Sequence, residues 1–79
     1  MLQPRAEPQD WAKVLERIEF PISLPALITY ARDVGGVDLE VHDVLGRLTR
    51  DSYDSLEQLV DEIRGFYLDD GIAPDNLPL

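Results

Sequence analysis

The sequence predicts a compact all-α domain of four short helices joined by short loops. Apolar residues recur four times at the spacing of one helix face, and each of these runs is bounded by capping or helix-breaking residues. No stretch shows the alternation of apolar and polar residues that is typical of strands. At 79 residues the chain has room for one domain. We divide it into a flexible arm over residues 1–9, a helical domain over 10–68 and an acidic, flexible tail over 69–79.

The first two helices are expected on either side of the Phe20-Pro21 dipeptide. Asp10 is placed to cap the first helix, which should end before Phe20 because a residue that precedes proline is driven out of the helical region. The second is expected from about residue 24 to 33, with Ser23 as its N-cap and Gly35-Gly36 as its left-handed stop. The apolar stripes, spaced 0, 3, 4 and 7, are Trp11, Val14, Leu15 and Ile18, then Leu24, Leu27, Ile28 and Ala31.

Two more helices are expected in the second half of the chain. Asp38 is placed to cap the third, and Ser55 with Gln58 three residues later has the pattern of a capping box for the fourth. The fourth helix should end between Arg64 and Leu68. The apolar stripes are Val41, Val44, Leu45 and Leu48, then Leu56, Leu59, Val60 and Ile63.

A short sequence similarity links the starts of the second and fourth helices. An aromatic residue, Phe20 or Tyr53, precedes the predicted caps Ser23 and Ser55, and each cap opens a Ser-Leu-x-x-Leu-Ile/Val run. This pattern is consistent with an internal repeat, and equally with two helix starts that share the same capping chemistry.

The charge of the chain is strongly negative and unevenly distributed. Sixteen acidic residues face seven basic ones, which gives a formal net charge of -9. Residues 38–79 hold eleven of the acids and only three arginines. Such a surface repels phosphate backbones and anionic lipids, so direct binding to nucleic acid or to a membrane is not expected. It favours a basic protein partner or serves only to keep the chain soluble.

Composition also indicates the compartment. The chain has no cysteine, which excludes disulfides, thiolate catalysis and cysteine-bound zinc and is typical of a reducing environment. Neither an apolar signal segment nor a membrane-length apolar run is present, so we expect a cytoplasmic protein. A domain of this size has a thin core, which association into a homo-oligomer would extend.

No pattern of catalytic or metal-binding residues is found. His42 is the only histidine, and its neighbours Glu40 and Asp43 point in different directions on a helix, so a solvated histidine is favoured over a general base or a ligand. Capping explains Ser23 and Ser55, and no serine lies in a Gly-x-Ser-x-Gly elbow. We therefore expect no catalytic residue, no metal and no cofactor, and a protein that is not an enzyme.

The best candidate for a binding surface is the fourth helix with the start of the tail. Glu57 and Asp61 lie four residues apart, so their like charges share one face of the helix. The Asp69-Asp70-Gly71 sequence lacks the alternating acids and the final glutamate of a calcium loop, so it adds charge rather than a metal site. A solvated acidic face is the alternative, as is core burial of the aromatic residues. The candidate partner-binding residues are Glu57, Asp61, Glu62, Phe66, Tyr67, Asp69 and Asp70.

Three runs of the sequence suggest a family. They are Phe-Pro-Ile-Ser-Leu-Pro-Ala-Leu-Ile-Thr-Tyr-Ala-Arg from residue 20, Val-Leu-Gly-Arg-Leu from residue 44 and Tyr-Asp-Ser-Leu-Glu-Gln-Leu-Val-Asp-Glu-Ile from residue 53. Over about residues 20–64 the chain thereby resembles a small bacterial family, domain of unknown function 2795. The shared positions are capping and core residues, so the resemblance implies a fold and brings no catalytic residue with it.

The function expected from these observations is that of a small acidic helical protein-interaction module that docks on a basic protein partner. Two alternatives stay open. One is a nucleic-acid mimic, whose carboxylates imitate phosphates and inhibit a DNA- or RNA-binding protein. The other is a structural subunit of a larger complex.

Overall fold

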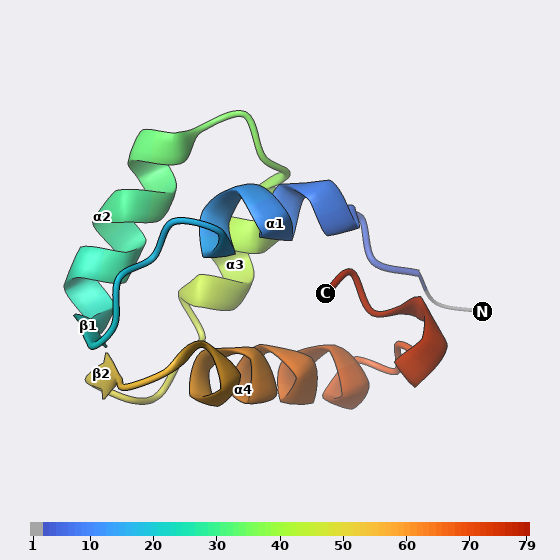
Figure 1. The fold of residues 1–79 in the computed structure, drawn as a ribbon. Helices are drawn as coiled ribbons and strands as arrows, with labels where there is room; N and C mark the ends of the chain where they lie inside the picture. The colour runs from blue at the N-terminus through green and yellow to red at the C-terminus, as the bar shows by residue number, and fades with distance from the viewer. Residues whose placement is uncertain (1–2) are drawn as a thin grey trace.

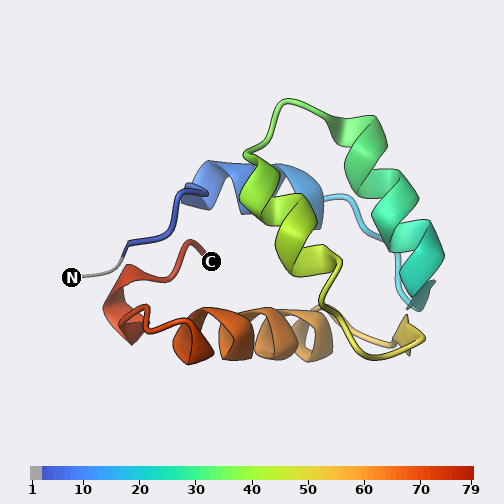
Figure 2. The same ribbon diagram turned by 180° about the vertical axis from the view of Figure 1, so that it is seen from behind.

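A computed structural model describes residues 3–79, and its helices confirm the four that the sequence predicts. They are α1 (Pro8–Leu15), α2 (Leu24–Val34), α3 (Leu39–Leu45) and α4 (Leu56–Asp69), followed by the short 3-10 helix η1 (Pro74–Asn76). The longest helix, α4, lies along one side of the molecule, with α1 and α3 across from it and α2 at one end (Figure 1). The same arrangement is visible from behind in Figure 2.

A small β-sheet corrects the predicted all-α class. Strands β1 (Ile22–Ser23) and β2 (Ser52–Tyr53) pair antiparallel, with Ile22 opposite Tyr53 and Ser23 opposite Ser52. With two residues per strand, the alternation of apolar and polar residues is too short to be recognised in the sequence. The domain is therefore broadly helical rather than strictly all-α.

The order helix, strand, helix occurs twice, as α1-β1-α2 and as α3-β2-α4. The predicted serine caps occupy matching places in the two halves. Ser23 Oγ accepts the amide of Ala26 at 3.3 Å, and Ser55 Oγ accepts the amide of Gln58 at 3.2 Å. The Gln58 side chain bonds back to the amide of Asp54 at 2.8 Å, one residue before the position expected for a capping box.

Helix α1 differs from its predicted boundaries at both ends. It starts at Pro8, with Glu7 in the N-cap position, and Asp10 accepts the Glu7 amide at 3.0 Å from inside the first turn. Asp10 is thus a capping-box partner and not the cap itself. The helix ends at Leu15, with Glu16 as its C-cap, so Ile18 is half-buried beyond the helix rather than on its stripe.

Helix α4 extends to Asp69, one residue past its expected range. Gly71 then adopts a left-handed φ of 91°, and its amide donates to the carbonyl of Leu68 at 3.1 Å. The amide of Ile72 donates to the carbonyl of Tyr67 at 3.0 Å. These two bonds form a Schellman motif, so the Asp-Asp-Gly sequence at residues 69–71 serves as a helix stop.

The core extends beyond the four predicted stripes. Ala6 from the arm and Ile72 from the tail are buried, and the side chain of Pro78 is fully buried. Residues 3–8 and 75–78 line one surface hollow together, so the arm and the tail lie side by side. Their flexibility stays a prediction. The buried hydrophobic residues are Ala6, Trp11, Val14, Leu27, Ala31, Val41, Val44, Leu45, Leu48, Tyr53, Leu59, Ile63, Tyr67 and Ile72.

Candidate functional site

One long side of α4 faces away from all the other elements in both views of the fold (Figures 1 and 2). Residues three or four positions apart share one face of a helix, so the exposed residues of α4 at this spacing form one surface. Exposed Asp54 and Asp69 lie at its two ends. We call this surface the outer face of α4, and it consists of the exposed Glu57, Asp61, Arg64 and Leu68 with the half-buried Gly65. Arg64 lies at its edge, because it also lines a hollow with residues of α1 and of the tail.

The outer face carries an excess of negative charge. Asp61 pairs with Arg64 at 3.1 Å, an exposed contact of the kind that contributes little to stability. Within residues 3–79, Glu57 and Asp69 have neither a hydrogen-bond nor an ion-pair partner on their side chains. Including Asp54, four acids therefore stand against one arginine on the outer face and its ends.

The structure places Glu62, a predicted partner-binding residue, against its own chain. Its carboxylate accepts the amide of Thr49 at 3.1 Å, the hydroxyl of Thr49 at 2.9 Å and the hydroxyl of Tyr53. Burial acts to raise the pKa of Glu62, but these hydrogen bonds outweigh it, and the pKa is lowered. Burial and the bond to Glu62 raise the pKa of Tyr53 to about 12. Glu62 thus joins α4 to β2 and to the segment before it.

Tyr67, also predicted for the partner surface, is a core residue with 2% of its surface exposed. Its hydroxyl accepts Trp11 Nε1–H at 2.9 Å and donates to Glu40 Oε2 at 3.0 Å. The rings of Trp11 and Tyr67 meet edge to face, with centroids 6.3 Å apart and an interplanar angle of 83°. Burial raises the pKa of Tyr67 well above its usual range. The sequence contained the signal, since Tyr67 continues the four-residue spacing of Leu59 and Ile63.

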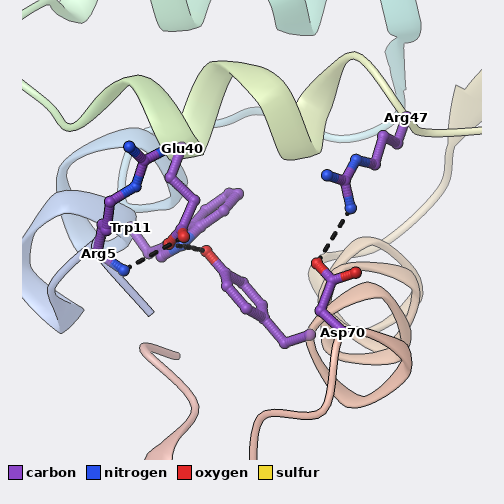
Figure 3. Close-up of polar contacts among 6 residues, drawn as sticks. Arg5, Trp11, Glu40, Arg47 and Asp70 are labelled. Carbon is purple, nitrogen blue, oxygen red and sulfur yellow. Dashed lines mark hydrogen bonds and ion pairs between the residues drawn. The ribbon is translucent and has the colours of Figure 1, made fainter. Parts of the chain in front are cut away.

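Glu40 is the structural residue that sequence reasoning missed. Its carboxylate accepts the backbone amide of Arg5 at 3.2 Å (Figure 3). It also accepts the backbone amide of Ala6 at 2.8 Å and the hydroxyl of Tyr67. One side chain on α3 therefore holds the arm and α4 at the same time. Its partners lie 27 to 35 residues away along the chain, and no local pattern indicates such contacts.

The remaining predicted residues lie around the end of α4. Phe66 is half-buried and packs against the core. Asp70 forms an ion pair with Arg47 at 3.1 Å, with both side chains about half exposed (Figure 3). Of the seven predicted residues, the structure therefore brings Glu57, Asp61 and Asp69 together on or beside the outer face of α4.

Away from α4, the histidine that the sequence singled out lies at a surface hollow. His42 is half-buried and lines an open hollow between α2 and α3, with Ile28, Arg32, Leu45 and Gly46. Among residues 3–79, no three or more histidine, aspartate or glutamate side chains are grouped so that they could hold a metal ion. In the same part of the chain, no helix has the length and apolar character needed to span a membrane.

Comparison with known proteins gives one match. Residues 6–60 match the model of a family described as protein of unknown function (DUF2795). The matched segment starts in the arm, ahead of the runs on which the resemblance rested, and ends inside α4, before Asp61. No curated protein and no solved structure matches the chain.

Proposed function

The chain belongs to the DUF2795 family, and we propose that it is a non-enzymatic interaction module that docks on a basic protein partner through the outer face of α4. The observation that carries this proposal is the unpartnered helix face with its surplus of acids. Exposed carboxylates without internal partners attract a basic surface over about 8–10 Å at physiological salt. Glu57 and Asp69 are of this kind.

Docking on a protein is favoured here over nucleic-acid mimicry. A mimic needs many free carboxylates in an array that resembles a phosphate backbone. In this chain several carboxylates are already used in the fold, because they accept hydrogen bonds from its own amides and hydroxyls. These residues are Asp10, Asp38, Glu40 and Glu62.

The cellular setting that we propose is the bacterial cytoplasm. The absence of cysteine suits a reducing compartment. A net charge of -9 suits a protein whose contacts with other proteins are steered by charge.

Affinity capture at two salt concentrations tests the proposal. The full chain is immobilised and exposed to bacterial lysate at about 50 mM and about 500 mM sodium chloride, and the retained proteins are identified by mass spectrometry. A basic partner held by charge is expected at low salt and should be lost at high salt, because screening shortens the range of the attraction. Recovery of no partner at either concentration contradicts the proposal.

Matched charge variants locate the surface. The double variant Glu57→Gln, Asp61→Asn removes two charges from the outer face of α4. The control Glu16→Gln, Glu19→Gln removes two charges from exposed positions at and beyond the end of α1. Loss of the partner with the first variant and retention with the second supports the proposal. Equal loss with both assigns binding to net charge and contradicts a role for this face.

A further inference from the structure

The isolated fold does not require the glycine at position 65. Gly65 lies in the interior of α4, and it is not among the glycines with a positive φ. A Cβ atom at this position would meet no heavy atom within 4 Å outside the local helix backbone. Glycine destabilises a helix interior relative to alanine, so the stability of the isolated chain favours a larger residue here.

The surroundings of Gly65 combine an apolar side chain with acids. Leu68 is 42% exposed and lies three residues further along, on the same face. Glu57 and Asp61 lie one to two turns before Gly65, and Asp69 lies one turn after it. The outer face thus offers a half-buried position without a side chain, Gly65, beside an exposed leucine, with negative charge on both sides.

We infer that the outer face of α4 receives a basic amphipathic helix of the partner, whose axis crosses α4 at Gly65. This inference rests on the proposed function and specifies the form of the partner. Packed helices usually keep their axes 8–10 Å apart because side chains separate them, and a glycine at the crossing point permits the closer end of that range. Apolar side chains of the partner contact Leu68, and its lysine or arginine side chains meet Glu57 and Asp61.

The charge of the face selects this occupant. Four acids against one arginine complement a basic helix. The outer face of a second copy carries the same surplus of acids and would be repelled. An extended basic segment would not need the close approach that the missing side chain at Gly65 allows.

A designed peptide serves as the probe. It has 20 residues, with leucine and alanine on one helical face and lysine beside them, and its dissociation constant from the full chain is measured by fluorescence anisotropy. Gly65→Leu is expected to weaken binding at least tenfold, because the new side chain occupies the crossing point. The matched control Ala26→Leu, at an exposed position of α2, should bind within about twofold of the unsubstituted chain.

Thermal unfolding shows whether Gly65→Leu still folds. We expect its midpoint to equal or exceed that of the unsubstituted chain by a few degrees, because the substitution improves helix propensity and its Cβ atom has no packed neighbour within 4 Å. Gly65→Ala, which adds a single methyl group, should be more stable than the unsubstituted chain and intermediate in peptide binding. Binding of Gly65→Leu within twofold of the unsubstituted chain overturns the inference.

The failure of this inference differs from the failure of the proposed function. If Glu57→Gln with Asp61→Asn weakens binding while Gly65→Leu does not, the acidic docking face stands and the helix crossing is refuted. If neither changes binding, both are refuted. A peptide of the same composition, kept from forming a helix by two proline substitutions, should bind at least tenfold more weakly, and equal binding overturns the inference. Sedimentation of the chain alone should be unchanged by Gly65→Leu, because dissociation of a dimer would assign the face to a second copy.

Discussion

Replacing Tyr67 with phenylalanine tests whether its buried hydroxyl holds α1, α3 and α4 together. The hydroxyl oxygen lies 2.9 Å from Trp11 Nε1 and 3.0 Å from Glu40 Oε2. Phenylalanine keeps the ring and its edge-to-face contact with Trp11, so the change is confined to one oxygen. Trp11 is 1% exposed, and its N–H would be left in the core without a partner.

The expected loss of stability follows from these two bonds. An unsatisfied buried donor costs about 1–3 kcal/mol, and a hydrogen bond to a charged group contributes about 1.5–3 kcal/mol. In the variant the Glu40 carboxylate still accepts hydrogen bonds from the amides of Arg5 and Ala6, so losing its bond to the Tyr67 hydroxyl costs less. We expect the free energy of unfolding to fall by about 2–4 kcal/mol. At about 0.05–0.15 kcal/mol per residue, a chain of 79 residues has only about 4–12 kcal/mol in total.

Urea denaturation, followed by circular dichroism and by the fluorescence of the single tryptophan, measures this loss. The midpoint should fall while the slope stays unchanged, because the surface exposed on unfolding is the same. Tyr30→Phe is the matched control, since Tyr30 is half-buried and its hydroxyl has no hydrogen-bond partner within residues 3–79. It should change stability by less than about 0.5 kcal/mol. A Tyr67→Phe variant within the same margin would refute the reasoning.

Three further perturbations address the second hydrogen-bonded cluster and the helix caps. Folding lowers the pKa of Glu62. The ionised Glu62 therefore stabilises the fold fully above the usual pKa of a glutamate, and this stabilisation is lost as pH falls through the lowered pKa. Glu62→Gln should flatten the acid side of a plot of thermal midpoint against pH, whereas the control Glu57→Gln should leave it unchanged. An unchanged acid slope in Glu62→Gln would contradict a stabilising role for the Glu62 carboxylate. The pKa of Tyr53 is raised to about 12. The neutral Tyr53 hydroxyl should therefore stabilise the fold fully below about pH 10, and this stabilisation should be lost as pH rises toward 12. Tyr53→Phe should reduce the alkaline loss, and an identical alkaline limb would show that Tyr53 is not its source. Ser23→Ala should lower the free energy of unfolding, measured by urea denaturation, by about 1 kcal/mol because the N-cap of α2 is lost. The control is Ser52→Ala, at an exposed serine of β2. A loss in Ser23→Ala no larger than that in the control would argue against the cap.

Features that depend on neighbouring residues could be predicted from the sequence. An N-cap needs only a suitable side chain and a free amide two or three residues later, so Asp38, Ser23 and Ser55 were identified correctly. The four apolar stripes are likewise a local property. The β1–β2 pair depends instead on residues about 30 positions apart, and it leaves no local pattern.

The candidate site shows the same limit. Glu57 and Glu62 are both glutamates of α4, and the charge pattern assigned both to a partner. Whether a carboxylate faces solvent or its own chain depends on where Thr49 and Tyr53 lie, which the tertiary structure decides. In the sequence, Gly65 falls where the fourth helix is expected to end, whereas α4 continues past it to Asp69. The open space beside Gly65 is a property of the tertiary structure and leaves no pattern in the sequence.

The most direct test of a docking role for α4 is a nuclear magnetic resonance titration of the isotope-labelled full chain with the lysine-, leucine- and alanine-containing peptide. Backbone amide shifts report which residues change surroundings on binding. We predict that the largest changes fall within residues 54–69, around Gly65 and Leu68, and that they vanish at about 500 mM salt as screening removes the attraction. Changes confined to α1 and α2, with α4 undisturbed, would contradict the account.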